Sequence, residues 1–389
     1  MRAPRQCDRG RVRALELMND YRRAALVHDF FVQDGGAERC AIELAALLRG
    51  AELYTSFFDR EVFGERLSAH RVQTWPAQRL LGPTRRFRSL LPFYPIWFSA
   101  LDLRRYDLVV SSSIAFSKAV RTRRDALHVS YVYTPMRYAW ALDSYLEGSS
   151  YGLPARLGAR TVRPLLKAWD RRTGRQPDVL VAISDTVRDR IRRLWGRDAE
   201  VIHPPVHTAE IALSHRDEGY LLVAARLLAY RRVDLAVRAA NMTGRELVVV
   251  GDGPERKRLQ AMAGTSVRFL GHVDRARLLD LFAGCHAYLV PGVEDFGIAP
   301  VEAMASGKPV VALARGGATE TVVDGVTGVF FENPDANALA AAIDRLEGLT
   351  FDPRTLRAHA EGFSADRFHQ RWRNLFARLG VDPSLYSGG

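Results

Sequence analysis

Short apolar runs rich in β-branched residues alternate along this chain with segments of helical spacing. Runs of this length and composition are typical of buried strands. A strand, a helix and a second strand in sequence predict a parallel sheet, so the fold class is α/β. The expected strands cover residues 24–28, 108–110, 129–133, 179–183, 220–224, 246–250, 267–270, 287–290 and 309–313.

The length of 389 residues predicts two domains. We place a hinge in residues 201–219, which contain Pro204 and Pro205 and show no periodicity. The expected parts are a basic tail over 1–20, a doubly wound domain over 21–205, a second over 206–364, and a closing helix over 365–389. For that helix, packing back on the first domain is one interpretation. Two doubly wound domains facing each other across a cleft would bind ligands at the carboxyl ends of their strands.

Composition excludes several classes of protein. With 47% hydrophobic and 26% charged residues the chain is not disordered. Cys7, Cys40 and Cys285 lie too far apart for a disulfide framework or a structural zinc site, which favours a reducing compartment. No apolar run approaches the roughly 20 residues of a spanning helix, and residues 1–20 lack a signal-peptide core. We therefore expect a cytoplasmic protein, and we expect residues before Met18 to be dispensable.

The net charge of +12 is unevenly distributed. Residues 71–105 hold seven arginines, interleaved with aromatic residues, against a single acid, Asp102. Two interpretations stay open: a solvated surface loop, or peripheral contact with an anionic membrane, where each cation contributes about 1 kcal/mol. No nucleic-acid module signature is present, so we expect no nucleic-acid partner.

The loop after the first expected strand ends in Gly35 and Gly36, directly before a helix. Adjacent glycines let backbone N–H groups approach a ligand, and a helix start favours a phosphate. The alternative interpretation is a turn that requires positive φ. A dinucleotide-binding GxGxxG fingerprint is absent from this loop.

Residues 291–309 are the most informative segment of the chain. A polar loop follows an expected strand, and Pro300 is typical of the first turn of a short helix. Glu302 lies among apolar residues of this helix, where an acid is costly unless it has a partner or ligand hydroxyls. Seven residues separate it from Glu294 in the loop.

This pattern resembles the retaining nucleotide-sugar glycosyltransferases of family four, the group 1 glycosyl transferases. Their architecture is GT-B, two Rossmann-like domains facing across a cleft. The resemblance covers the chain after about residue 21 and is strongest over 220–328. It implies that Glu294 hydrogen-bonds the donor sugar and Glu302 the ribose. It further implies substrate contacts at Asp295, Phe296, Gly297 and Ile298.

A second motif of this family matches residues 225–234. The resemblance implies that Arg226 and Arg231 clamp the diphosphate and stabilise the leaving nucleotide. Arg231 stands where the family has lysine, and a guanidinium binds phosphate in a different, bidentate geometry. A solvated arginine cluster is the alternative. Substrate contacts are also implied at Gly253, Val273 and Asp274.

In the first domain, residues 131–140 resemble bacterial surface-polysaccharide enzymes, many of them mannosyltransferases. Tyr133 stands where that group has a histidine, and Arg137 follows in the same motif. We take both as substrate-binding, although a tyrosine with a pKa near 10 is a poor general base. His28, at the end of the first expected strand, is either a core histidine or an acceptor-side residue.

The resemblance implies a retaining glycosyltransferase that moves a sugar, best matched by mannose from GDP-mannose, to a lipid-linked or polysaccharide acceptor at the inner membrane face. Its catalytic residues would be Arg226, Arg231 and Glu294. Because the sequence holds no Asp-x-Asp, we expect no metal and no cofactor beyond the donor. Two alternatives stay open: a non-catalytic nucleotide-sugar-binding protein and a nucleotide-sugar 2-epimerase of the same architecture.

Overall fold

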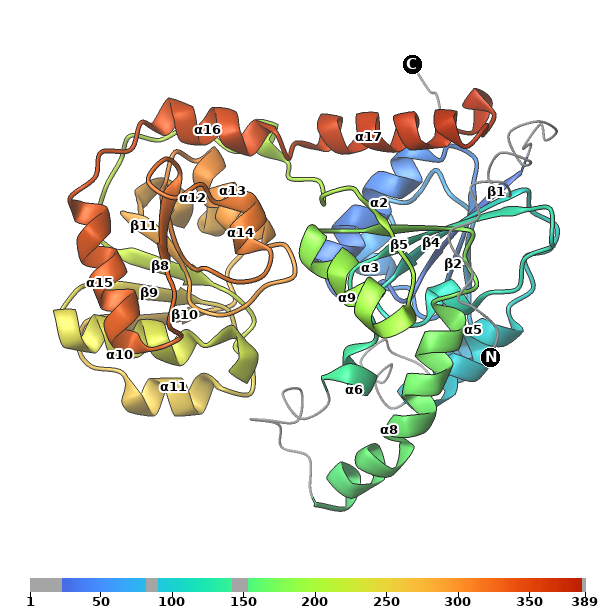
Figure 1. Cartoon of the computed structure of the whole chain (residues 1–389), viewed down its shortest axis with the longest axis horizontal. Helices are drawn as coiled ribbons and strands as arrows, with labels where there is room; N and C mark the ends of the chain where they lie inside the picture. Colours follow the sequence, from blue (N-terminus) through green and yellow to red (C-terminus); the bar gives the residue numbers. More distant parts are fainter. Residues whose placement is uncertain (1–22, 82–89, 142–152, 387–389) are drawn as a thin grey trace. The chain divides into compact units, whose positions relative to one another are not determined.

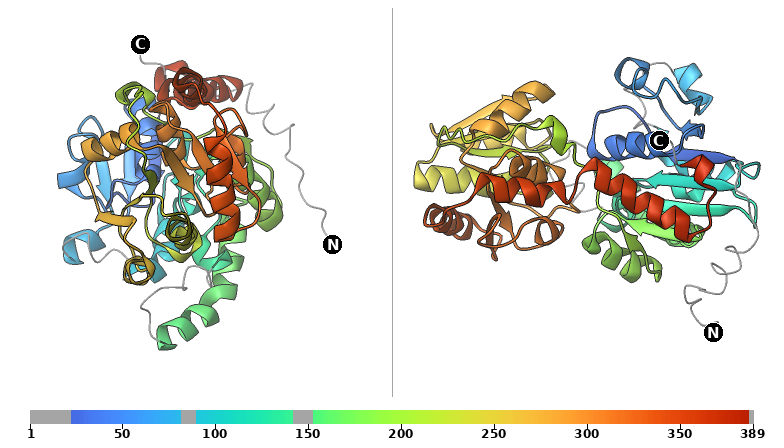
Figure 2. Two further views of the ribbon diagram at one scale, coloured as in Figure 1. Left: turned by 90° about the vertical axis from the view of Figure 1, so that its left-hand side faces the viewer. Right: turned by 90° about the horizontal axis from the view of Figure 1, so that it is seen from above.

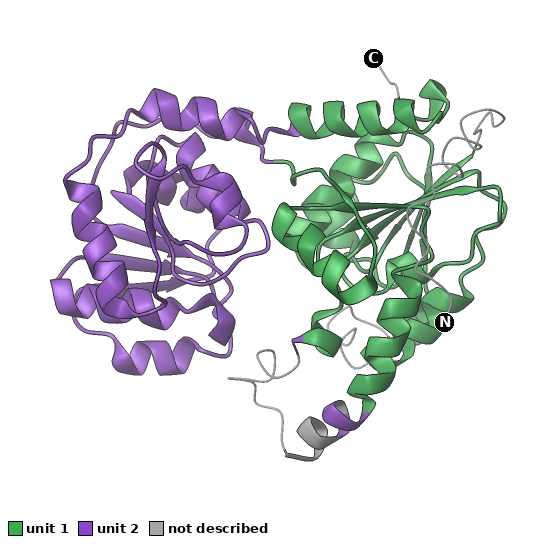
Figure 3. Ribbon diagram, in the orientation of Figure 1, with its two compact units in different colours: residues 1–140, 162–205, 366–389 green, residues 141–161, 206–365 purple. Residues whose placement is uncertain are grey.

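The computed structural model describes residues 23–81, 90–141 and 153–386 (Figure 1). The expected basic tail over 1–20 lies outside the described residues, as do Arg85, Arg86 and Arg88 of the basic stretch. The chain forms two compact units (Figure 3). The first unit comprises Met1–Trp140, Val162–Pro205 and Asp366–Gly389, and the second comprises Ala141–Thr161 and Val206–Ala365.

The first unit is built on a parallel sheet that, among the described residues, has seven strands in the order β3-β2-β1-β4-β5-β6-β7. All the strands expected in this half are confirmed, with small shifts at their ends. β2, β3 and β7 were not expected, because their residues are short, partly exposed and lack a continuous apolar run. The strands are β1 (Ala24–His28), β2 (Glu52–Thr55), β3 (Val72–Thr74), β4 (Leu108–Ser113), β5 (Leu127–Val132), β6 (Val179–Ala182) and β7 (Glu200–Val201).

Helices pack on this sheet and end where the sequence provides caps. Ser184 caps α9 by accepting the Val187 N–H, and Gly196 ends the same helix in the left-handed conformation. The helices are α2 (Gly36–Leu47), α3 (Arg60–Phe63), α4 (Ala77–Leu81), α5 (Tyr94–Ala100), α6 (Arg137–Trp140), α8 (Leu153–Thr173), α9 (Asp185–Trp195) and α17 (Ala365–Arg378), with short 3-10 turns at η2 (Ser117–Ala119) and η5 (Pro383–Leu385).

The last long helix, α17, lies along the first unit (Figure 2). Its buried residues Phe368, Trp372, Leu375 and Phe376 recur at helical spacing. The Trp372 ring meets the ring of Tyr131 on β5 edge to face, with centroids 5.5 Å apart. The C-terminal helix thus completes the core of the unit that contains the N-terminal strands.

A buried ionic network joins several elements of the first unit. Lys118 and Asp170, 1% and 0% exposed, form an ion pair at 2.9 Å. Two indole N–H groups, from Trp140 and Trp195, donate to the second carboxylate oxygen of Asp170 at 2.7 and 2.8 Å. This carboxylate therefore connects η2, α6, α8 and α9 at one buried point.

The second unit is a parallel sheet with the order β10-β9-β8-β11-β12-β13 among the described residues. The expected strands are again confirmed, and only β13 was missed, because its short run begins with Gly328. A Cβ atom there would lie 2.0 Å from the Val310 carbonyl oxygen, so a close approach to β12 explains the glycine. The strands are β8 (Leu221–Ala224), β9 (Leu247–Val250), β10 (Val267–Gly271), β11 (Ala287–Val290), β12 (Val310–Leu313) and β13 (Gly328–Phe331).

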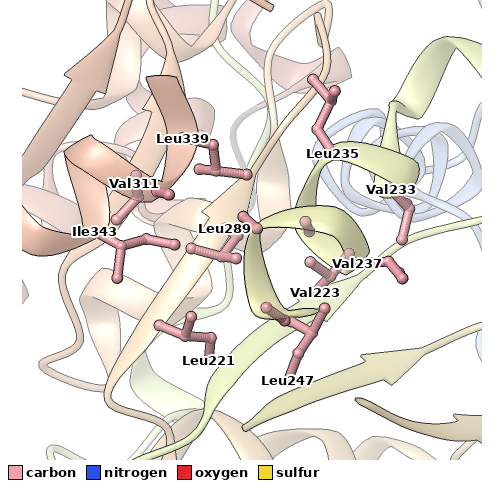
Figure 4. Packing of buried hydrophobic residues seen from close by; sticks show 14 of the residues in the cluster. Leu221, Val223, Val233, Leu235, Val237, Leu247, Leu289, Val311, Leu339 and Ile343 are labelled. Carbon is pink, nitrogen blue, oxygen red and sulfur yellow. The ribbon is translucent and has the colours of Figure 1, made fainter. Parts of the chain in front are cut away.

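The core of the second unit lies between its strands and the helices α10 and α15 (Figure 4). Leu221, Leu247 and Leu289 come from three neighbouring strands, while Val237 and Ile343 come from these two helices, and all five are buried. The helices are α10 (Val233–Thr243), α11 (Arg256–Met262), α12 (Arg275–Gly284), α13 (Ile298–Ala305), α14 (Ala318–Thr321), α15 (Ala336–Glu347) and α16 (Pro353–Glu361), with 3-10 turns at η3 (Thr208–Glu210) and η4 (Ala229–Arg231). In the described part of the chain no helix has the length and apolar character to cross a membrane.

Candidate active site

The strand order of the second unit reverses between β8 and β11. From β8 the chain proceeds outward through β9 to β10, and from β11 it proceeds the other way through β12 to β13. At such a reversal the loops after the two central strands diverge, which leaves a crevice at the carboxyl ends of the strands. The loop after β8 carries Arg226 and Arg231, and the loop after β11 carries Glu294. The sheet topology alone therefore places these three residues around one crevice.

Glycines hold these loops in close contact. A Cβ atom on Gly292 would lie 2.6 Å from the Tyr230 carbonyl oxygen, and one on Gly317 would lie 2.3 Å from the Phe296 Cα. The Gly317 N–H also donates to the Glu294 carbonyl oxygen at 2.8 Å. The loops are packed so closely at these two points that a larger residue at either glycine would push them apart.

Arg231 and Glu294 form an ion pair across the crevice, and their side chains are 25% and 15% exposed. Burial opposes the charge on Arg231, but the Glu294 carboxylate outweighs burial and raises the pKa of the guanidinium. The Arg231 guanidinium thus stays charged. The structure brings together two of the three residues that the family resemblance marks as catalytic.

Arg226 is the third of these residues and differs from Arg231 in its surroundings. It is the second residue after the end of β8 at Ala224, and it is exposed. Its side chain makes no ion pair or hydrogen bond with the described residues. A guanidinium in this state offers its full set of donors to a phosphate.

Glu302 lies within α13 and is only 5% exposed. Its Oε1 accepts a hydrogen bond from the guanidinium of Arg275, the first residue of α12, at 2.6 Å. Arg275 provides the partner that an acid among apolar residues requires. Sequence analysis missed Arg275, although its position directly after Asp274 was the available signal.

The start of α13 supplies backbone donors beside these carboxylates. Gly297 is its N-cap in the left-handed conformation (φ 93°), which requires glycine, and it has no side chain to cap the helix. Phe296 is 3% exposed, while Asp295 and Ile298 are half-buried. The free N–H groups of this first turn favour an anion.

The remaining residues expected in this unit lie in neighbouring loops. Gly253, after β9, packs against the loop after β8, since a Cβ atom there would lie 2.3 Å from the Leu227 carbonyl oxygen. Asp274 caps α12 by accepting the Arg277 N–H at 2.7 Å, and Val273 beside it is half-buried. These contacts give Gly253 and Asp274 local structural tasks, and their contact with a substrate stays a prediction.

In the first unit, Gly35 is the N-cap of α2 and Gly36 its first residue. The φ of Gly35 is −104°, and Gly36 has no positive φ either, so the interpretation as a turn requiring positive φ is wrong. The reason for a small residue is crowding: a Cβ atom on Gly35 would lie 2.6 Å from Oε2 of Glu38.

Glu38 itself was missed by sequence analysis, although it lies three residues before Ala41 on the buried face of α2. It is 2% exposed, and its Oε1 has no hydrogen-bond partner in the described residues. Burial, helped by the negative charges of Asp34 and Asp29, raises the pKa of this carboxyl to about 8. Its position as the third helical residue lets it accept the Gly35 N–H, in the manner of a capping box.

We expect Glu38→Gln to abolish part of the pH dependence of stability. The pKa of Glu38 is about 8 in the folded protein and about 4.5 in the unfolded chain. Folding is therefore most favourable below pH 4.5, where the carboxyl is protonated in both states. This contribution to stability is lost as the pH rises toward 8. Glutamine keeps the cap without the titration, so the variant should gain up to about 3 kcal/mol over the wild type at pH 7. Urea unfolding at pH 5, 7 and 8 measures this gain. Parallel curves for the two proteins would contradict it.

Tyr133 connects β5 to α2 rather than facing solvent. It is 8% exposed, and its hydroxyl donates to the Ala37 carbonyl oxygen at 2.9 Å. The hydroxyl oxygen of Tyr133 also lies 2.8 Å from Ser112 Oγ. Because its one proton goes to Ala37, Ser112 must donate to Tyr133. Burial raises the pKa of Tyr133 well above its usual value, so the phenol cannot act as a base at neutral pH.

His28 continues this chain of hydrogen bonds. Its Nδ1 lies 3.1 Å from the Ser112 carbonyl oxygen and 3.0 Å from Ser112 Oγ, and a carbonyl only accepts, so Nδ1 carries the proton. Burial lowers the pKa of His28 to about 3, which keeps the ring neutral. His28 is thus a core histidine whose Nε2 has no hydrogen-bond partner among the described residues.

Arg137, the other residue expected to bind substrate in this motif, begins α6 and is half-buried.

Comparisons with known proteins agree on one family. Residues 209–360 match the family described as glycosyl transferases group 1, and residues 34–210 match glycosyltransferase family 4. The GDP-mannose-dependent alpha-(1-6)-phosphatidylinositol monomannoside mannosyltransferase of Mycolicibacterium smegmatis is 30% identical over 251 residues, 56% of this chain and 64% of that protein. The D-inositol 3-phosphate glycosyltransferase of Xylanimonas cellulosilytica is 34% identical over 222 residues, 49% of this chain and 53% of that protein.

The matches thus span about half to two thirds of the length of these relatives. Among solved structures, Anabaena Alr3699/HepE in complex with UDP and glucose aligns with a TM-score of 0.66 at 20% identity, and the alignment covers 92% of this chain and all of that one. A likeness at this identity supports the GT-B arrangement of two Rossmann-like folds.

Proposed function

This chain belongs to the family 4 glycosyltransferases, the group 1 glycosyl transferases, and from that premise we propose that it transfers a sugar from a nucleotide donor with retention of configuration. The observation that carries the proposal is the meeting of Arg231 and Glu294 at the strand-order reversal, beside the exposed Arg226. Cations and a carboxylate at one crevice suit a ligand that combines a diphosphate with sugar hydroxyls.

In this proposal the two arginines act on the leaving group. Arg226 and Arg231 neutralise the charge that develops on the departing nucleotide diphosphate, and the N–H groups at the start of α13 add to the same field. Glu294 accepts hydrogen bonds from sugar hydroxyls and orients the ring. The acceptor hydroxyl attacks from the face that the diphosphate leaves, and the donor phosphate takes its proton.

Glu302 is proposed to accept hydrogen bonds from the ribose hydroxyls. Arg275 is then a positioning residue, because it holds the Glu302 carboxylate at 2.6 Å without being needed at the reacting atoms. For the donor we propose GDP-mannose, because the mycolicibacterial relative is a GDP-mannose-dependent mannosyltransferase. For the acceptor we propose a lipid-linked or polysaccharide molecule, with the enzyme peripheral on the inner face of the membrane, and for the reaction no metal ion.

Calorimetric titration of the protein in chelator with GDP-mannose, UDP-glucose, GDP and UDP tests the proposal. We expect the guanine nucleotides to bind at least about tenfold more tightly than the uracil ones. Glu302→Ala should weaken this binding at least about tenfold, since it removes charge-assisted hydrogen bonds. Glu332→Ala, at an exposed glutamate of the same unit, is the matched control and should leave it unchanged. Absence of binding by all four ligands would overturn the proposal.

A further inference from the structure

Two neighbouring helices of the first unit expose large apolar side chains. Ser99 of α5 accepts a hydrogen bond from the Trp169 indole of α8 at 3.3 Å, so the two helices meet at this point. Ile96 lies three residues before Ser99 and Leu165 four residues before Trp169, so each precedes this contact by one turn. We call the exposed apolar residues of these helices the apolar ridge: Phe93 (54% exposed), Ile96 (69%), Val162 (45%) and Leu165 (71%).

A cavity of about 580 Å³ adjoins the apolar ridge and is rich in arginine. Ser99 and Trp169, the residues of the interhelical contact, also line this cavity. Its charged lining consists of Arg104, Arg121, Arg123, Arg124, Arg172 and a single acid, Asp178, whose carboxylate accepts the His128 N–H.

The arginines of this cavity are unequally engaged. Arg104 pairs with Asp102, and Arg123 pairs with Asp107 and Asp125. The remaining three arginines, Arg121, Arg124 and Arg172, form no ion pair within the residues that the structure describes. One of them, Arg121, donates through Nε to the Ser99 carbonyl oxygen at 2.8 Å. The other two, Arg124 and Arg172, are exposed and available to anionic oxygens, and a guanidinium binds phosphate in a bidentate geometry.

We propose that the apolar ridge and the adjoining arginine cavity dock on the surface of an anionic lipid bilayer. The four apolar side chains enter the boundary between headgroups and acyl chains, and the arginines bind lipid phosphates beside them. The half-buried indole of Trp169 lies between the two, where an aromatic ring with one polar edge suits the interface. The surface belongs to the first unit and the donor crevice to the second. The inference therefore deepens the peripheral membrane location of the proposed function, on which it rests, by assigning the residues that contact the lipid.

A bilayer fits this surface better than a nucleic acid because of its composition. A nucleic acid would bind the arginines, but it would not contact the apolar side chains. Ile96 and Leu165, which are more than two thirds exposed one turn from the cavity, would then stay in water. A bilayer presents phosphates and an apolar phase within one side-chain length of each other. A bilayer therefore complements both the apolar ridge and the arginine cavity.

Vesicle sedimentation tests the inference with the full chain. Vesicles of phosphatidylcholine containing 30% phosphatidylglycerol should bind the wild type, and pure phosphatidylcholine vesicles should bind it much more weakly. Arg124→Ser with Arg172→Ser should lower the partition coefficient about 30-fold, at about fivefold per cation. Ile96→Ser with Leu165→Ser should lower it at least about tenfold.

Matched controls lie in the second unit. Lys257→Ser with Arg354→Ser removes the same charge from exposed positions, and Val323→Ser with Val326→Ser removes two apolar side chains that are 44% and 48% exposed. Neither control should change the binding. If the wild type ignores the anionic vesicles, or if the first-unit variants bind as the controls do, the inference is overturned. An effect of the arginine pair without one of the apolar pair would overturn it too, by showing anion binding without insertion. Nucleotide titration of the same variants should be unchanged, which separates this inference from the proposed function.

Discussion

Replacing Arg226 with alanine should lower the rate of sugar transfer about a hundred- to thousandfold. Arg226 is exposed after β8, and its side chain has no partner among the described residues, so its guanidinium is available to the diphosphate. Its loss removes a fixed positive charge from the position where negative charge develops. The melting temperature should stay unchanged because no internal contact is removed. Release of the nucleotide from the donor measures the rate.

Arg238→Ala is the matched control for this change. Arg238 lies on α10 in the same unit and is about half exposed, and its one ion pair among the described residues is with Asp234 at 3.8 Å. We expect this variant to retain at least half of the wild-type rate. Equal rates for the Arg226 and Arg238 variants would show that Arg226 belongs to a solvated cluster and not to the site.

Replacing Asp170 with alanine should destabilise the protein by about 3–5 kcal/mol. The change leaves the 1% exposed ammonium of Lys118 without its carboxylate, and breaking a buried ion pair from one side typically costs this much. It also removes the acceptor of the Trp140 and Trp195 indole N–H groups. Urea unfolding followed by tryptophan fluorescence measures the loss.

Asp125→Ala provides the comparison, since Asp125 is 68% exposed and its ion pair with Arg123 lies at the surface. That variant should lose at most about 0.5 kcal/mol. A loss below about 1 kcal/mol for Asp170→Ala would contradict the assignment of Asp170 as the ionic centre of the first unit.

The strands that could be predicted are those whose own residues form a continuous apolar run. β1 and β11 were predicted with their observed bounds, because both are buried on both faces. β2 alternates buried and half-buried residues, and β7 has two residues, so neither differs locally from a loop. Their strand character comes from pairing with neighbours distant in sequence, which a local pattern does not show.

The candidate site was predictable in its residues and not in its contacts. Spacing and resemblance identified Arg231, Glu294 and Glu302. Arg231 and its partner Glu294 are 63 positions apart in the sequence, however, so no local pattern predicts their ion pair. Arg275 was missed for the same reason, since its role depends on α12 and α13 lying side by side. Tyr133 was expected at the substrate, whereas its hydroxyl bonds to Ala37 and Ser112.

The most direct measurement is the stereochemistry of transfer from GDP-mannose. The full chain is incubated in chelator with GDP-mannose and a membrane lipid extract as the source of acceptor, and GDP release and the anomeric signal of the product are followed by proton NMR. The account predicts GDP release, a product with the anomeric configuration of the donor, and loss of both in Glu294→Gln. A product of inverted configuration, or release that Glu294→Gln leaves unchanged, would contradict it.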